Sequence, residues 1–270
     1  MLKDLIPTSV RKPLTRTRIR FLSAAGRTIG SLSPYETLIV VPKDAFVADG
    51  LATEHDSSFS ADDNFRRGYA RAIKAVGGEW RIPWRTHVAI WAADVCRSTP
   101  GDFVELGTGR GWMFSAVLGS MDWASMTKRL FLFDMFTSGR VDPITGRELE
   151  DSTPHPCYAL SYEATKANFS EWDRVELVRG RIPESLDNVE LPKIAFMHID
   201  LNNADSEVGA LRLLWPRLST GAFVLLDDYA YRGYRPQYDA MNALGRELGF
   251  KVLSLPTGQG LICKSAQPPQ

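Results

Sequence analysis

The sequence predicts an α/β fold whose core is a seven-stranded, mostly parallel sheet with helices on both faces and a last strand that runs antiparallel. From Asp102 onward, short runs rich in β-branched and aromatic residues alternate with helical stretches, which is typical of parallel strands joined by crossover helices. Near the end of the chain, only Pro256-Thr-Gly-Gln259 separates two such runs, which predicts a closing antiparallel hairpin. The chain has 270 residues, 44% of them hydrophobic, enough for one such domain with an N-terminal elaboration.

The same alternation gives the order of the elements. Strands are expected at 102–106, 130–134, 174–179, 193–199, 222–227, 250–255 and 260–264. Helices of the sheet region are expected near 111–120, 158–170, 205–216 and 236–248. Two further helices are predicted ahead of the sheet, at 62–76 and 86–96, because apolar residues recur there at helical spacing.

Charge balance and cysteine content exclude several classes of partner. The 32 Lys and Arg residues equal the 32 Asp and Glu residues, so the chain lacks the basic excess that nucleic acids and membrane surfaces attract. The three cysteines show no Cys-x-x-Cys spacing, which indicates neither a disulfide framework nor a thiolate metal site. No stretch approaches the roughly 18 apolar residues of a membrane span. We therefore expect a soluble, cytoplasmic protein with a small-molecule ligand.

The run Glu105-Leu-Gly-Thr-Gly-Arg-Gly111 ends the first strand of the sheet and opens a helix. Its glycines lack a Cβ, so the turn can adopt positive φ and leave backbone N–H groups bare for a ligand. The spacing differs from the Gly-x-Gly-x-x-Gly of dinucleotide sites, and Glu105 would repel a pyrophosphate but attract a cationic amino-acid tail. The run resembles motif I of the class I S-adenosylmethionine (SAM)-dependent methyltransferases. This resemblance places SAM against Glu105, Gly107, Thr108, Gly109 and Gly111.

Two residues at later strand ends are further candidates for the cofactor, because ligands of open α/β sheets bind beyond the carboxyl ends of the strands. Asp134 ends the second strand, where an acid accepts both ribose hydroxyls of a nucleoside; the alternative is a helix N-cap. Arg181 follows the third strand, where a methyltransferase usually frames the adenine; the alternative is a solvated charge.

Three aspartates predict a metal site. Asp200 follows the fourth strand, and Asp227 and Asp228 follow the fifth, so their carboxylates converge if the two strands are neighbours. Three such charges stay ionised together only if a cation neutralises them, and oxygen ligands with room for a substrate oxygen suit Mg²⁺. Such an ion would polarise a bound hydroxyl and lower its pKa. The alternative is that Asp200 caps a helix and the adjacent pair opens a loop.

Two longer segments, His198-Ile-Asp-Leu-Asn-Asn203 and the run from Ala210 to Tyr229, are similar to the macrocin O-methyltransferase family. The resemblance implies an Mg²⁺-dependent enzyme that methylates hydroxyls, often on sugars of glycosylated natural products. It implies metal binding by the three aspartates, with Asp200 also a candidate general base. It further implies a Rossmann-like SAM-dependent methyltransferase domain at 99–266, preceded by an N-terminal extension and helical lid region at 1–98.

Two histidines are candidates for catalysis. His198 shares a strand face with Asp200 by period-two alternation, so it could act beside the metal; the alternative is a satisfied core histidine. His155 lies in an irregular segment, where a loop base could overhang the substrate; the alternative is a loop histidine without a function.

These observations together predict a SAM-dependent, Mg²⁺-dependent O-methyltransferase that acts on a hydroxyl of a small molecule, most simply a sugar hydroxyl. We expect it to form a homo-oligomer and to bind neither nucleic acid nor membrane. The alternatives are a metal-independent or N-directed methyltransferase of the same fold, or a SAM-binding protein without catalytic activity. A nicotinamide oxidoreductase is disfavoured by the glycine spacing.

Overall fold

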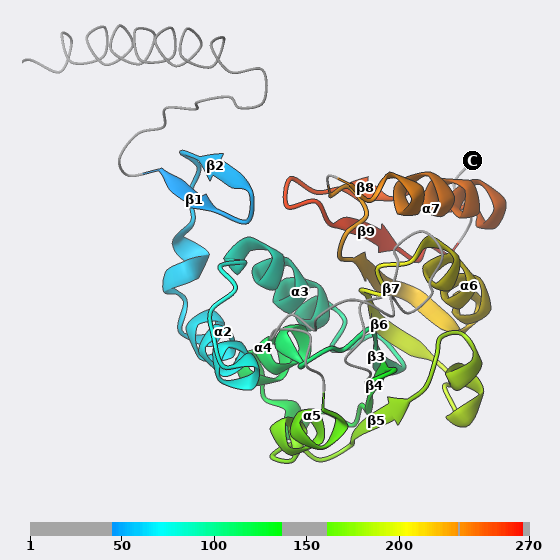
Figure 1. Ribbon diagram of the computed structural model, residues 1–270, viewed down its shortest axis with the longest axis horizontal. Helices are drawn as coiled ribbons and strands as arrows, with labels where there is room; N and C mark the ends of the chain where they lie inside the picture. The colour runs from blue at the N-terminus through cyan, green and yellow to red at the C-terminus, as the bar shows by residue number, and fades with distance from the viewer. Residues whose placement is uncertain (1–44, 137–160, 232, 267–270) are drawn as a thin grey trace, which may run out of the picture. The chain divides into compact units, whose positions relative to one another are not determined.

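The computed structural model describes residues 45–136, 161–231 and 233–266 (Figure 1). The chain divides into two compact units, and each is described by itself. The first comprises Met1–Val47 and Ala52–Asp56, and the second comprises Ala48–Leu51 and Ser57–Gln270. Strands β1 (Phe46–Ala48) and β2 (Leu51–Thr53), which lie where the two units meet in the sequence, form a small two-stranded sheet.

The second unit is built on a seven-stranded sheet, as the sequence predicts. In spatial order its strands are β5 (Val175–Arg179), β4 (Leu130–Asp134), β3 (Asp102–Leu106), β6 (Ile194–Ile199), β7 (Leu218–Leu226), β9 (Gly260–Cys263) and β8 (Leu253–Ser254). The first five strands run parallel, whereas β9 pairs antiparallel with both β7 and β8. The predicted closing hairpin and the adjacency of the fourth and fifth sheet strands are therefore confirmed.

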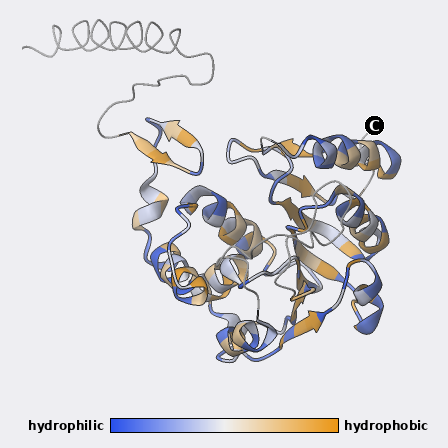
Figure 2. Ribbon diagram, in the orientation of Figure 1, coloured by the Kyte–Doolittle hydropathy of each residue, from blue (hydrophilic) through white to orange (hydrophobic). Residues whose placement is uncertain are grey.

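Helices cover both faces of this sheet (Figure 1). The helices of this unit are α2 (Asp63–Val76), α3 (Pro83–Val95), α4 (Trp112–Ser120), α5 (Tyr162–Phe169), α6 (Ala204–Leu214) and α7 (Arg235–Leu248), of which α2 packs mainly on α4. Residues of α2, α3, α4 and α5 join one buried apolar cluster, and residues of α6 and α7 join another. The hydrophobic colours of Figure 2 follow the strands, and hydrophilic colours mark much of the helical surface.

Strand β3 shows how the sequence builds the two layers. Phe103 packs into the cluster of α2 to α5, while Val104 and Leu106 pack into the cluster of α6 and α7. Successive side chains of a strand point to opposite faces, so a strand covered on both faces is apolar almost throughout. Glu105, the acid in the interior of β3, must therefore point toward the layer of α3 and α4, the side of Phe103.

Several element boundaries differ from the sequence prediction. Helix α3 begins three residues early, at Pro83, since proline tolerates the first helical turn, where no N–H partner is needed. Helix α6 ends at Leu214, and a 3₁₀ turn containing Pro216 follows. Strand β7 begins at Leu218, four residues before the predicted start at 222. The prediction missed these residues because a glycine, Gly221, with a positive φ of 81°, interrupts the strand pattern there. The predicted strand 250–255 pairs only at Leu253–Ser254, on the exposed sheet edge.

This topology brings the predicted site to one edge. The chain leaves β3 and β6 at the same end of the sheet, and β4 and β7 flank them there. The order changes direction between β3 and β6, which is the switch point where ligands of such sheets bind. Among the described residues, no helix combines the length and the apolar character needed to cross a membrane.

Candidate functional site

The glycine turn between β3 and α4 is shaped by close approaches of backbone. Gly107 and Gly111 have φ of 89° and 86°. A Cβ on Gly107 would collide with the backbone carbonyl oxygen of Asp200, and one on Gly111 would come within 2.5 Å of the Phe169 ring. Gly109, with φ of 55°, faces open space instead, since a Cβ there would meet none of the described residues within 4 Å. Only glycine therefore fits at Gly107 and Gly111, whereas Gly109 borders open space that a ligand could occupy.

The expectation that this turn leaves its N–H groups bare is wrong for the structure described. The N–H groups of Gly107 and Thr108 donate to the carbonyl of Phe133, at 2.9 and 3.1 Å, and that of Gly111 donates to the carbonyl of Thr108 at 2.8 Å. The N–H of Gly109 donates to Asp134 Oδ2 at 2.8 Å. Buried backbone donors are rarely left unpaired, so the turn satisfies itself from the neighbouring strand.

Asp134 connects the end of β4 to this turn. Besides the Gly109 bond, its Oδ1 accepts the N–H of Phe136 at 2.7 Å. Burial raises the pKa of Asp134, and the backbone N–H groups that it accepts partly oppose that rise. Asp134 therefore stands beside the open space at Gly109. The residues after Phe136, where a helix capped by Asp134 would continue, lie outside the described part of the chain.

Glu105 and His198 form a buried pair that the sequence did not predict. They are opposite each other in the β3–β6 register, and Glu105 Oε1 lies 3.0 Å from His198 Nδ1. His198 Nε2 lies 3.6 Å from Asp227 Oδ1, on the other side of the ring. Burial alone would lower the pKa of His198, but the carboxylates of Asp227 and Glu105 raise it to about 10. Both ring nitrogens of His198 therefore face carboxylates within the buried sheet, which favours the structural interpretation of His198.

The three predicted aspartates do converge. One carboxylate oxygen from each of Asp200, Asp227 and Asp228 lies within 4.8 Å of the other two. Burial and the charges of Asp227 and Asp228 raise the pKa of Asp200 well above its ordinary value. Burial and Asp227 raise the pKa of Asp228 to about 6, although Arg85 opposes the rise. Burial and mutual repulsion thus make the carboxylates of Asp200 and Asp228 costly to ionise in the absence of a cation.

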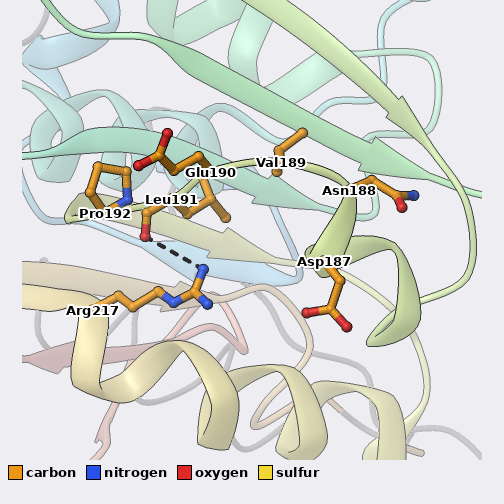
Figure 3. A pocket seen from close by; sticks show the side chains of 7 residues that line it. All are labelled: Asp187, Asn188, Val189, Glu190, Leu191, Pro192 and Arg217. Carbon is orange, nitrogen blue, oxygen red and sulfur yellow. Dashed lines mark hydrogen bonds between the residues drawn. The ribbon is translucent and has the colours of Figure 1, made fainter.

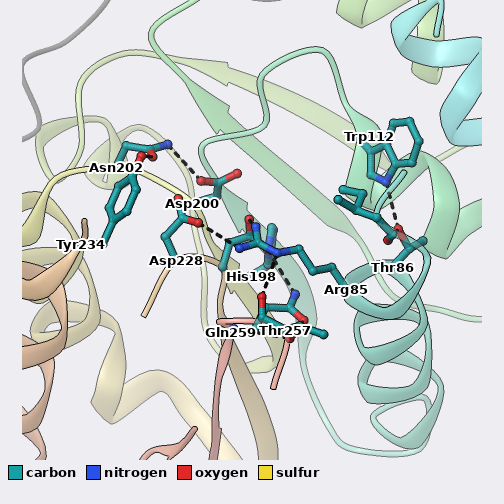
Figure 4. A network of polar contacts seen from close by, with 12 residues as sticks. Arg85, Thr86, Trp112, His198, Asp200, Asn202, Asp228, Tyr234, Thr257 and Gln259 are labelled. Carbon is teal, nitrogen blue, oxygen red and sulfur yellow. Dashed lines mark hydrogen bonds and ion pairs between the residues drawn. The ribbon is translucent and has the colours of Figure 1, made fainter. Parts of the chain in front are cut away.

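Arg85, from the first turn of α3, is the main site residue that sequence reasoning missed. Its Nη1 lies 2.5 Å from Asp227 Oδ2. Its Nη2 lies 3.2 Å from Asp228 Oδ1 (Figure 4). Burial lowers the pKa of the guanidinium, but the charges of Asp227 and Asp228 outweigh this and raise it. The sequence did contain one signal for this role, a lone arginine in an otherwise apolar helical stretch. A charge on a buried helix face requires a partner, so this arginine could have been expected to pair with an acid.

Uncharged polar side chains complete the network (Figure 4). Gln259, fully buried in the turn before β9, donates from Nε2 to Asp227 Oδ1 at 3.2 Å. Asn202 donates from Nδ2 to Asp200 Oδ1 at 3.0 Å, and the Tyr234 hydroxyl donates to Asn202 Oδ1 at 2.7 Å. These donors orient the aspartates. They come from loops, for which the sequence offered no periodic signal.

Two predicted residues remain, His155 and Arg181. His155 lies outside the described residues. Arg181 is exposed, two residues beyond the end of β5 and next to Gly180. A surface pocket lined by residues 187–192 and Arg217 lies at the opposite edge of the sheet, before β6 begins, and contains none of the predicted site residues (Figure 3).

The sheet order, the antiparallel final hairpin and the glycine turn at the switch point define a Rossmann-like methyltransferase fold. Residues 85–244 match the family described as Macrocin-O-methyltransferase (TylF), and this match covers more than half of the chain. The chain belongs to that family. The match begins at Arg85, ahead of the predicted domain boundary at residue 98, which itself stays a prediction.

Relatives with assigned activities come from Streptomyces. The 8-demethyl-8-(2,3-dimethoxy-alpha-L-rhamnosyl)-tetracenomycin-C 4'-O-methyltransferase of Streptomyces olivaceus is 30% identical over 143 residues, 48% of this chain and 54% of the relative. The chain thus spans about half the length of that relative. The demethyldecarbamoylnovobiocin O-methyltransferase of Streptomyces niveus is 23% identical over 218 residues, 70% of this chain and 81% of the relative.

Solved structures support the fold. The O-methyltransferase NovP superimposes with a TM-score of 0.58 at 18% identity, covering 78% of this chain and 100% of NovP. The apo structure of CalS11, a TDP-rhamnose 3'-O-methyltransferase of calicheamicin biosynthesis, gives a TM-score of 0.51 at 18% identity, covering 77% of this chain and 96% of CalS11.

Proposed function

We propose that this protein is a SAM-dependent O-methyltransferase that methylates a sugar hydroxyl of a glycosylated small molecule with the assistance of Mg²⁺. The observation that carries the proposal is the contact between the two halves of the site. The backbone of Gly107 packs against the carbonyl of Asp200 so closely that no Cβ fits between them. A cofactor at the glycine turn and an acceptor at the aspartates would therefore be neighbours, as methyl transfer requires.

The cofactor half fits SAM through Gly109 and Asp134. The open space at Gly109 lies beside a buried carboxylate at the end of β4, the place where an acid binds ribose hydroxyls. A ligand in this space would accept a hydrogen bond from the Gly109 N–H and donate one to Asp134 Oδ2, in place of the bond between these two groups. Membership of an O-methyltransferase family supports SAM rather than a dinucleotide as that ligand.

The aspartate half fits a divalent cation by its donor chemistry and its charge. The carboxylates of Asp200, Asp227 and Asp228 lie within 4.8 Å of one another, and Arg85 pairs with only two of them. Carboxylate oxygens are ligands of choice for Mg²⁺, and a divalent cation would offset their mutual repulsion. Asp200, Asp227 and Asp228 would hold the ion. When bound there, it would polarise the acceptor hydroxyl and lower its pKa.

The side chains of this site have two tasks in the transfer. The sulfonium already activates the methyl group, so the protein must orient the acceptor oxygen and remove its proton. Asp200 is the candidate base, because it lies where the aspartates meet the glycine turn, and burial and the charges of Asp227 and Asp228 raise the pKa of its carboxyl. Asn202 donates to Asp200 Oδ1, which leaves Oδ2 as the oxygen to receive the proton.

A sugar acceptor is supported by one relative and by the aromatic side chains beside the aspartates. The Streptomyces olivaceus relative is named for a rhamnosyl-bearing tetracenomycin. Tyr231, 50% exposed, and Tyr234 follow Asp228 in the chain, and aromatic rings give an apolar surface with a polar edge for a sugar face. A sugar hydroxyl is less acidic than a phenol, so metal assistance suits it.

The test is conversion of SAM to S-adenosylhomocysteine with rhamnosylated and other glycosylated acceptors, before and after chelation. The Asp200→Asn variant should bind SAM but lose turnover by about 10² to 10⁴, the range for a lost general base. The exposed helical acid Asp205 supplies the matched control, Asp205→Asn, which should keep full turnover.

Three outcomes separate the alternatives. Turnover that survives chelation would make the enzyme metal-independent. Turnover only with amine acceptors would make it N-directed. SAM binding without turnover on any acceptor would favour a protein that binds SAM without catalysis.

A further inference from the structure

A buried arginine borders the aspartate site on the side of α3. The side chains of Arg85, Asp227 and Asp228 are 11%, 10% and 14% exposed. Solvent therefore screens the two ion pairs of Arg85 little, and their charges act at nearly full strength on anything that approaches the aspartates. The sequence offered no role for this residue, and the proposed transfer reaction does not use it.

Arg85 is held in place from several sides. Its Nε donates to the carbonyl of Thr257 at 3.3 Å, and its guanidinium lies 5.0 Å from the centroid of the Tyr231 ring. The N–H of the preceding residue, Trp84, donates to the carboxylate of Asp49. A surface lysine could swing away from an incoming cation, but a buried guanidinium fixed at both ends cannot do so freely.

We propose that Arg85 is the resident counter-ion of the aspartate site. It holds Asp227 and Asp228 together when no divalent cation is bound, and its charge weakens the binding of such a cation. This inference rests on the proposed function in so far as that function places Mg²⁺ at the same aspartates. It makes Arg85 a positioning residue that sets metal affinity and takes no part in the chemical step.

Two effects of Arg85 on metal affinity oppose each other. A full charge within about 4 to 6 Å changes an ionic equilibrium by about 10- to 1,000-fold, which would weaken cation binding. Loss of a partner that orients a metal ligand lowers metal affinity by about 10- to 100-fold, so by this effect Arg85 would strengthen cation binding. Asp227 keeps Gln259 at 3.2 Å and His198 at 3.6 Å as other partners, so its orientation does not depend on Arg85 alone. The charge effect should therefore prevail.

The experiment measures Mn²⁺ binding to the full chain by electron paramagnetic resonance, with Mg²⁺ as competitor and without acceptor. Removal of the charge in Arg85→Gln should tighten Mn²⁺ binding at least about tenfold. Arg85→Lys keeps the charge and should bind Mn²⁺ within about threefold of the wild type. The matched control is Arg97→Gln, an exposed arginine just after the other end of α3, about 18 Å along the helix axis.

Thermal unfolding gives a second readout. Without metal, Arg85→Gln should unfold at a lower temperature than the wild type, because two buried carboxylates lose their partner. Saturating Mn²⁺ should raise the unfolding temperature of Arg85→Gln more than that of the wild type. If Arg85 had a structural role without any effect on the cation, Arg85→Gln would lower the unfolding temperature by the same amount with and without Mn²⁺.

The outcomes for the inference and for the proposed metal use are distinct. Tighter binding by Arg85→Gln supports the inference, whether or not the wild type binds Mn²⁺. If only the variant binds, the inference stands and metal use by the wild type is refuted. Equal or weaker binding by the variant overturns the inference and leaves metal use intact. Absence of binding in both proteins overturns both.

A chemical rescue covers the case in which Arg85→Gln does not fold. Arg85→Ala leaves a cavity that a guanidinium ion at millimolar concentration can occupy in place of the missing side chain. The variant is therefore refolded in the presence of that ion. Dilution of guanidinium should then tighten Mn²⁺ binding to Arg85→Ala, while wild-type binding stays the same. Mn²⁺ binding that is independent of guanidinium would contradict the counter-ion role.

Discussion

Glu105 and His198 face each other across β3 and β6, with 3.0 Å between Oε1 and Nδ1. Both side chains are 2% exposed, and His198 lies between this carboxylate and that of Asp227. The His198 ring thus links Glu105 of β3 to Asp227 of the aspartate cluster. The pair therefore belongs to the polar support of the site.

Removal of the Glu105 charge should destabilise the fold. In Glu105→Gln, the buried His198 loses one of its two carboxylates, and breaking a buried ion pair costs about 3 to 5 kcal/mol, less where a hydrogen bond is kept. We expect a loss of about 2 kcal/mol in the free energy of unfolding, measured by urea titration. The matched control, Glu176→Gln at an exposed position of β5, should change that free energy by less than about 0.5 kcal/mol. An equally small effect at Glu105 would contradict the importance of the pair.

The glycine turn should respond differently at two of its positions. Gly107→Ala should cost at least about 3 kcal/mol, the sum of backbone strain and overpacking, because its Cβ meets the Asp200 carbonyl. Gly109→Ala should cost only about 1 kcal/mol, because its Cβ meets open space. If SAM fills that space, Gly109→Ala should still weaken SAM binding at least about tenfold, measured by calorimetry. Unchanged SAM affinity in Gly109→Ala would place the cofactor elsewhere.

Metal removal should affect catalysis more than folding. Chelation should lower turnover at least about 100-fold, because the acceptor hydroxyl loses its Lewis acid, and Mg²⁺ should restore it. The far-ultraviolet circular dichroism should be unchanged, since Arg85 holds Asp227 and Asp228 when the ion is absent. Full turnover in the presence of the chelator would refute the metal-assisted mechanism.

His87 should make stability depend on pH. Its ring stacks on Phe59, with centroids 4.1 Å apart, and burial lowers its pKa, although Asp62 opposes this. The unfolded chain then binds a proton at a higher pH than the folded chain does, so stability is lost as pH falls below about 6.5. His87→Gln should lose less free energy of unfolding than the wild type between about pH 7.5 and pH 5. Exposed His55 provides the control, and His55→Gln should keep the wild-type dependence.

Much of the fold could be predicted because its signals are local. The strands after residue 101 are short apolar runs, and a sheet with helices on both faces makes such runs apolar on both sides. The convergence of Asp200 with Asp227 and Asp228 followed from the strand order alone. Boundaries were less predictable, as at β7, where Gly221 obscures the strand pattern.

The sequence by itself determined the layered α/β fold, the glycine turn and the aspartates at the strand ends, because hydrophobic periodicity and the positions of glycine and aspartate are written along the chain. Only the tertiary structure decided which side chains lie opposite these aspartates and the glycine turn. Arg85 and Asp227 are 142 residues apart, and the partners of Glu105 and Gln259 also lie on other elements. Such pairs depend on register and helix placement, which are set by packing of the whole sheet. The charges that surround the proposed metal were therefore invisible until the elements were assembled.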